Sequence, residues 1–129
     1  MPIWTALSML VLVQSSTASS APPPGTSRTD LQRHDLSLTG WQTIQTRVDF
    51  APHAVAAKHK HPGEEIIYVL KGRLQYVVEG QGPITLGPGQ VLFVPYGRPH
   101  SAVNVGQEPA AELATYVIEK GKPLVVPVP

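Results

Sequence analysis

The chain has 129 residues and a formal net charge of +1, with no cysteine, fourteen prolines and eleven glycines. That length provides for one domain. The small net charge argues against nucleic acid or an anionic membrane surface as a partner, and the absence of cysteine excludes a disulfide framework, thiolate metal ligands and a cysteine nucleophile.

Residues 1–21 have the pattern of a secretory signal peptide. An apolar run at residues 3–13 precedes small polar residues that offer two cleavage sites. The run is shorter than the roughly 20 residues that span a bilayer. We therefore expect a mature protein that begins near Ser19 or Pro22, is secreted or periplasmic, and keeps no membrane association after cleavage.

Residues 22–41 are predicted to be a polar linker that leads into the fold. The segment opens with three prolines and then carries Leu31, Leu36 and Leu38 among polar residues. The part from residue 30 to residue 40 is compatible with an edge strand or with an irregular connection. Residues 119–129 are expected to form a Pro-rich C-terminal tail.

Residues 42–118 consist of short segments with strand character separated by turns. In residues 43–50, Ile44, Thr46, Val48 and Phe50 alternate with polar residues, which predicts a half-buried antiparallel strand. Residues 65–71 are expected to pair with residues 73–78 around Gly72. About eight or nine strands and no helix result. The sequence therefore predicts an all-β protein with a single antiparallel jelly-roll barrel, either closed or built from two sheets.

His59 and His61 lie two residues apart in one of these strands. Side chains at i and i+2 of a strand share a face, so both imidazoles point the same way. Pro62 and Gly63 turn the chain, and Glu65 can return to that face. Two neutral imidazoles and a carboxylate at one point suit a metal ion.

His100, after a second apolar strand and a turn, is a fourth candidate ligand. The two stretches together resemble the metal-binding motifs of the cupin superfamily, in its small single-domain form, over residues 42–118. The residues that agree in type and spacing are His59, His61, Glu65 and Gly72 in the first motif and Gly89, Pro95, Gly97, His100 and Asn104 in the second.

The resemblance implies a metal centre held by His59, His61, Glu65 and His100. One divalent transition metal ion is expected, with Fe, Mn, Ni, Co, Cu and Zn all compatible. Four protein ligands leave two octahedral positions for a small organic molecule, for water or for O2. The expected function is that of a secreted metal-dependent enzyme, dioxygenase-like or a lyase or isomerase; the alternative is a non-catalytic module that binds a metal or a small ligand. A homodimer is compatible with either.

The remaining polar and aromatic candidates are interpreted as structural. Glu64 should point away from the site, and Ile67 and Val69 should make the pocket wall apolar. Asn104 is expected to be a structural hydrogen-bonding residue, and no catalytic base is evident beyond the ligands. The residues expected to lie on the surface, in loops or in the core rather than in catalysis are His34, Arg47, His53, Tyr68, Tyr76, Phe93, Arg98 and Tyr116.

Overall fold

The structure is a computed structural model that describes residues 25–129. The predicted signal peptide and the three prolines after it lie outside the described residues. The described part contains ten β-strands and no α-helix. It accordingly has no helix with the length and apolar character needed to cross a bilayer.

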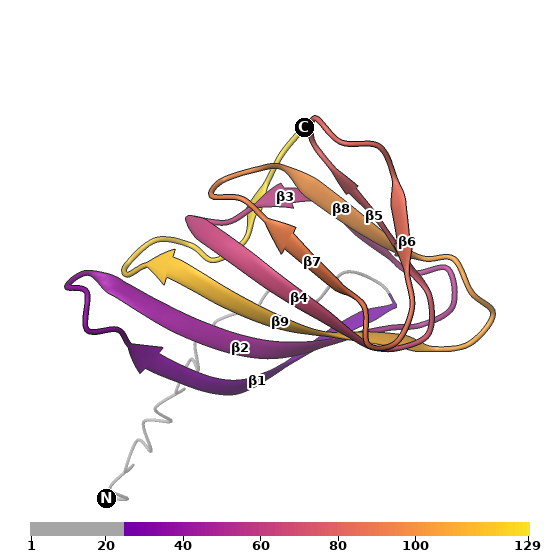
Figure 1. Cartoon of the computed structure of the whole chain (residues 1–129), viewed down its shortest axis with the longest axis horizontal. Helices are drawn as coiled ribbons and strands as arrows, with labels where there is room; N and C mark the ends of the chain where they lie inside the picture. Colours follow the sequence, from indigo (N-terminus) through magenta and orange to yellow (C-terminus); the bar gives the residue numbers. More distant parts are fainter. Residues whose placement is uncertain (1–24) are drawn as a thin grey trace, which may run out of the picture.

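The strands form two five-stranded antiparallel sheets that make the two walls of a jelly-roll barrel (Figure 1). The first sheet has the spatial order β1 (Thr26–Asp35), β2 (Trp41–Phe50), β9 (Ala110–Glu119), β4 (Gly63–Lys71) and β7 (Val91–Val94). The second has the order β10 (Val126–Pro127), β3 (Val55–Lys60), β8 (His100–Asn104), β5 (Leu74–Val78) and β6 (Ile84–Leu86). The all-β jelly-roll prediction is confirmed, in its two-sheet form.

The inner faces of both sheets follow the alternation expected from the sequence. Every second residue of β2 from Gln42 to Phe50 is buried, and so is every second residue of β4 from Gly63 to Val69. The main apolar core lies between the sheets and includes Phe50 and Leu74. The phase of β4 places Glu65 inside the barrel, as predicted.

The predicted hairpin between residues 65–71 and 73–78 is wrong. β4 pairs with β7 and β9, whereas β5 pairs with β6 and β8, so the chain changes sheets at Gly72. Gly72 has a φ of 76°, and a Cβ there would lie 2.5 Å from the Cβ of Ala110. The turn therefore needs glycine for its backbone conformation and for its close approach to β9.

The chain segments on either side of residues 42–118 also belong to the fold. β1 pairs with β2 over nearly its whole length, so the edge-strand interpretation is the right one of the two. In the expected tail, Val126 and Pro127 pair with Lys60 and His59 of β3. The barrel therefore includes residues on both sides of the predicted range 42–118, because β1 and β10 form an edge strand of one sheet each.

Asn104 holds the end of β8 in place, as its structural interpretation predicted. It is fully buried, and its side-chain amide donates to the carbonyl oxygens of Phe50, Ala51 and Glu108. Its Oδ1 accepts a hydrogen bond from the Gly106 backbone N–H. These bonds fix the strand that begins with His100.

Candidate metal centre

The structure brings together the four residues that the sequence singled out. His59 is near the end of β3, His61 follows that strand, Glu65 is on β4 and His100 begins β8. One potential ligand atom from each lies within 4.8 Å of the others. His61, Glu65 and His100 are buried and His59 is half-buried. The cluster joins the two sheets, since Glu65 comes from one and the other strand residues from the second.

Backbone carbonyl groups orient all three imidazoles through their Nδ1 atoms. The Nδ1 of His59 lies 2.6 Å from the Ala57 oxygen, that of His61 lies 2.6 Å from the Leu124 oxygen, and that of His100 lies 2.9 Å from the Arg98 oxygen. A carbonyl oxygen can only accept, so Nδ1 carries the proton in each ring. In the neutral imidazole Nε2 then keeps a lone pair, as a metal ligand requires.

Glu65 faces two of these Nε2 atoms with one oxygen. Its Oε2 lies 3.0 Å from the Nε2 of His61 and 2.8 Å from the Nε2 of His100. Burial raises the pKa of Glu65, but hydrogen bonds from His100 and His61 outweigh it and lower the pKa well below its ordinary value, so the carboxyl is ionised. At these distances the Glu65 oxygen and the two Nε2 atoms share protons when no metal is bound, and a metal ion bound there would take the place of those protons.

The pKa shifts of two of the histidines differ in direction, and that of His59 favours the neutral ring that a metal ion requires. Burial lowers the pKa of His59 to about 4, with His100 and His61 adding repulsion, so this ring is neutral at pH 7. Burial lowers the pKa of His100 too, but Glu65 outweighs it and the net shift is upward. Ligands about 2.1 Å from one ion lie at most about 4.2 Å apart, so a small contraction of the cluster would accommodate it. The residues present therefore fit a divalent transition metal.

A small cavity of about 30 Å³ lies inside the barrel beside three of the ligands, His59, Glu65 and His100. Part of its wall is formed by Ala56 and Ala102, which are paired directly across β3 and β8. Their short side chains leave the space that larger residues would fill. This volume accommodates a group of about two or three heavy atoms.

Glu112 lines the same cavity and was not found from the sequence. It is 6% exposed, and its Oε2 accepts a short hydrogen bond from the hydroxyl of Tyr76, which is 1% exposed. The sequence did contain the signal: Glu112 shares the strand phase of Ala114, Tyr116 and Ile118, all of which are inward. The wall predicted to be apolar from Ile67 and Val69 therefore also carries a carboxyl group, on the neighbouring strand of the same sheet.

Arg28 is a second residue of this cavity that the sequence did not reveal. The side chain as a whole is exposed on β1, but one guanidinium nitrogen donates to the Tyr116 hydroxyl at 3.0 Å. The guanidinium carbon is 5.6 Å from the centre of the Tyr116 ring. The sequence gives no signal for Arg28, because it lies in the segment predicted to be a polar linker. The cavity thus has a cation at one wall and a carboxyl group at another.

The other sequence candidates lie away from the cluster. Glu64 is half-buried and faces away from the interior, and His53 and Arg98 are exposed. His34 is exposed on β1 beside Gln32, and Arg47 forms an exposed ion pair with Asp49 at 3.0 Å. Tyr68 and Phe93 are exposed on the outer face of the first sheet. None of these residues belongs to the cluster, as predicted.

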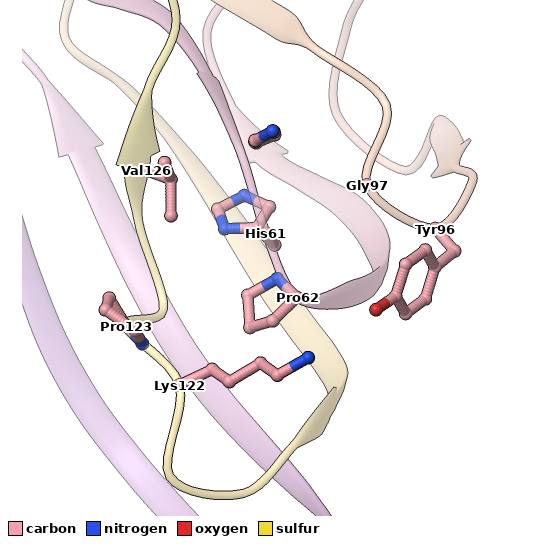
Figure 2. Close-up of a pocket in the computed structure, with 8 residues that line it drawn as sticks. His61, Pro62, Tyr96, Gly97, Lys122, Pro123 and Val126 are labelled. Carbon is pink, nitrogen blue, oxygen red and sulfur yellow. The ribbon is translucent and has the colours of Figure 1, made fainter.

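On its outer side the cluster adjoins a surface cleft of about 520 Å³, with His61 at its back (Figure 2). Tyr96 lies on one side of the cleft and Pro123 on the other, and the Lys122 side chain crosses below. The Lys122 amine and the Tyr96 hydroxyl both bind Glu119 Oε2, at 2.6 and 2.8 Å. The carboxylate of Glu119 therefore offsets the lysine charge beside the cleft.

Comparison with known proteins places these features in context. A family profile described as "Cupin domain" matches residues 46–119. Germin-like protein 1 of Brassica napus is 36% identical over 85 residues, which is 62% of this chain and 41% of that protein. The dimethylsulfoniopropionate lyase DddQ of Ruegeria pomeroyi is 46% identical over 43 residues, 33% of this chain and 21% of the lyase.

Solved structures of two enzymes also superpose on this chain. An oxalate oxidase in complex with the substrate analogue glycolate superposes with a TM-score of 0.66 at 25% identity, over 87% of this chain and 65% of that one. The DddQ lyase structure superposes with a TM-score of 0.59 at 29% identity, over 67% of this chain and 43% of that one. The chain spans about two fifths of the germin-like protein and less than two thirds of either enzyme.

Proposed function

We propose that this chain, which belongs to the cupin domain family, is a metal-dependent enzyme that acts on a small organic carboxylate. The observation that carries the proposal is the position of the ligand cluster at the wall of an internal cavity that also contains Arg28. A site built only to stabilise the fold would have no need of a cavity and a guanidinium group beside it.

The chain's own residues provide the ligands and their orientation. His59, His61, His100 and Glu65 would hold the ion, and the carbonyl groups behind the imidazoles keep each Nε2 directed at it. Four protein ligands leave coordination positions open on an octahedral ion. The ion would supply Lewis-acid or redox chemistry to a substrate bound there.

Arg28 is the residue that would orient a carboxylate substrate. Its guanidinium remains charged at any physiological pH, and its planar array of N–H donors matches a carboxylate group. Tyr116 already holds one of its nitrogens at the cavity wall. The cavity of about 30 Å³ limits the part of the substrate that enters to a few heavy atoms.

The relatives named above support a carboxylate as the substrate class. One is an oxalate oxidase and another is a lyase of dimethylsulfoniopropionate, and both substrates carry carboxylate groups. Their two reactions differ, so both an oxidase-type reaction and a lyase or isomerase reaction are retained for this chain. The sequence features alone are also compatible with a protein that only binds a metal or a small ligand.

The test starts from the metal that the protein carries when it is purified from its own host. Protein loaded with that metal is then given oxalate, with O2 consumption as the readout, and dimethylsulfoniopropionate, with substrate loss as the readout; glycolate binding is measured by calorimetry. Turnover of a carboxylate supports the proposal. Stoichiometric metal with no binding of any of the three carboxylates contradicts it, and binding without turnover identifies a non-catalytic binding protein.

Arg28→Gln is the variant that tests the carboxylate interpretation. It should weaken glycolate binding by about 10-fold or more, because a charged hydrogen bond is replaced by a neutral one at a desolvated wall. Arg98→Gln, at an exposed arginine of the turn before His100, serves as the matched control and should leave binding unchanged. Equal binding by both variants would remove Arg28 from the site.

Export of the protein is the second part of the proposal. It is supported by the apolar run and the small residues in the first 21 positions. N-terminal sequencing of the protein recovered from its host should give a start near Ser19 or Pro22. An intact Met1 on protein recovered from the cytoplasm would contradict export.

A further inference from the structure

Glu112 is a buried carboxyl group that the metal cluster does not use. In the register of β4 and β9, Tyr116 lies opposite Glu65 and Glu112 lies opposite Val69. Successive inward positions are two residues apart, so Glu112 is two layers deeper in the barrel than the metal ligand Glu65. It nevertheless lines the same cavity as Glu65 and His100.

The hydrogen bond from Tyr76 determines which oxygen of Glu112 can carry a proton. The Tyr76 hydroxyl donates to Oε2, so that oxygen serves as an acceptor. A proton held by the neutral carboxyl therefore belongs on the other oxygen, Oε1. Tyr76 comes from β5 in the opposite sheet, so the bond also fixes Glu112 across the barrel interior.

We propose that Glu112, positioned by Tyr76, is the proton-transfer residue for a small ligand in the cavity. The inference rests on the proposed function, because it assigns the acid and base of that same site. It fills the role for which the sequence offered no residue.

Glu112 can either give one proton to the substrate or take one proton from it. As an acid, Glu112 loses the proton from Oε1, the O–H bond breaks, and the proton joins a basic atom of the substrate. As a base, the resulting carboxylate takes a proton from the substrate, and the electron pair of the broken bond stays on the substrate. No oxidant or reductant takes part in either step.

The surroundings of Glu112 suit a group that exchanges a proton near neutral pH. Burial and the charge of Glu65 on β4 raise the pKa of Glu112 to about 8, and they outweigh the Tyr76 hydrogen bond and the charges of Arg28 on β1 and His100 on β8. A pKa close to the working pH is favourable for general acid–base catalysis.

Infrared spectroscopy of the zinc-loaded protein tests the inference without requiring turnover. A protonated carboxyl group has a carbonyl band separate from the carboxylate bands. We expect such a band at a pH low enough to protonate Glu112, its loss as the pH rises, and a shift in its frequency when glycolate is added. Glu112→Gln should lack the band and still bind one zinc, whereas Glu108→Gln, at an exposed position before the same strand, should keep it.

If the Glu112 variant does not fold, Tyr76→Phe is a second way to assign the carbonyl band to Glu112. Removal of the hydroxyl donor should shift the band, because the bond to Oε2 is lost. A band that is missing at every pH of the titration, a band unaffected by Tyr76→Phe or a band unmoved by glycolate overturns the role of Glu112. Calorimetry separates the two proposals: glycolate binding with an unmoved band leaves the proposed function intact, whereas an absence of binding of glycolate, oxalate and dimethylsulfoniopropionate contradicts that function itself.

Discussion

Glu64 and Glu65 are adjacent carboxylates with opposite surroundings. Glu65 is 2% exposed and lies within 3.0 Å of two imidazole nitrogens, whereas Glu64 is half-buried on the other face of β4. Their difference arises only from the alternation of side chains along a strand. Neighbouring residues of the same type thus have separate roles.

Glu65→Gln should therefore weaken metal binding far more than Glu64→Gln. The first change removes a negative charge and a ligand oxygen from a buried cation site, and we expect a loss of at least about 10-fold, the lower end of what the loss of an outer-shell partner costs. Glu64→Gln should leave the affinity within about twofold of the wild type. Chelator competition measures both values, and equal losses would show that the strand phase is wrong.

At the level of residues, the sequence predicted ligands better than it predicted the cavity. His59, His61 and Glu65 could be grouped because their spacing is local and strand alternation is regular, whereas His100 was added through the second motif of the family resemblance. Glu112 was not predicted as a site residue, although the alternation of its strand places it on the inner face with Ala114 and Tyr116. Arg28 could not have been found, because its role depends on Tyr116, which lies 88 positions away.

Among the elements, the C-terminal segment contributes most to the site beyond what was expected of it. The Leu124 oxygen accepts from His61 Nδ1 at 2.6 Å, and the Val128 N–H donates to the Lys58 oxygen at 3.0 Å. The Leu124 side chain packs against the core cluster that contains Tyr116. This segment fixes the orientation of one ligand and the edge of the strand that carries another.

Leu124→Ala should reduce metal affinity while the barrel stays folded. Its side chain anchors the segment, so a smaller residue would loosen the carbonyl that orients His61, with an expected loss of about 10-fold. Val125→Ala is the control, because Val125 is 43% exposed and should change the affinity little. Titration of both variants with zinc against a competing chelator makes the comparison; unchanged affinity in Leu124→Ala would mean that the carbonyl keeps its place without that anchor.

Strand pairing shows where sequence reasoning about elements fails. The segments on both sides of Gly72 were correctly predicted as strands, but their partners were wrong because tight turns join strands within one sheet as well as between two sheets. Gly72 comes close to Ala110, which is far along the chain, and no local pattern predicts such a contact. Local patterns predict strands, whereas their partners depend on packing across the barrel.

For the molecule as a whole, a bound metal would act as a cross-link between the two sheets. Glu65 belongs to the sheet of β4, and His59 and His100 belong to the opposite sheet. An ion that binds only the folded chain stabilises it by about 2.7 kcal/mol when its concentration is 100 times Kd. The thermal stability should therefore report on the occupancy of the site.

This metal-dependent stability should decrease as the pH falls from 7 to about 4.5. In the metal-bound fold the three imidazoles stay unprotonated, but in the unfolded chain they take up protons below about pH 6.5. The unfolded state then binds more protons, so the free energy of unfolding falls with the pH.

In the metal-free protein, His59 and His100 change the stability in opposite directions as the pH falls. The pKa of His59 is lowered to about 4, so its contribution to stability is lost as the pH falls below the unfolded value; the pKa of His100 is raised, so its contribution increases over the same range. Glu112, whose pKa is raised to about 8, adds stability to the metal-free fold as the pH falls, so the metal-free melting temperature should not fall with the pH as the zinc-bound one does. Melts with zinc and with chelator from pH 7 to 4.5 should converge at the acid end. Two curves that remain parallel would mean that the histidines hold no metal, and the barrel would then need a different ligand to explain its polar interior.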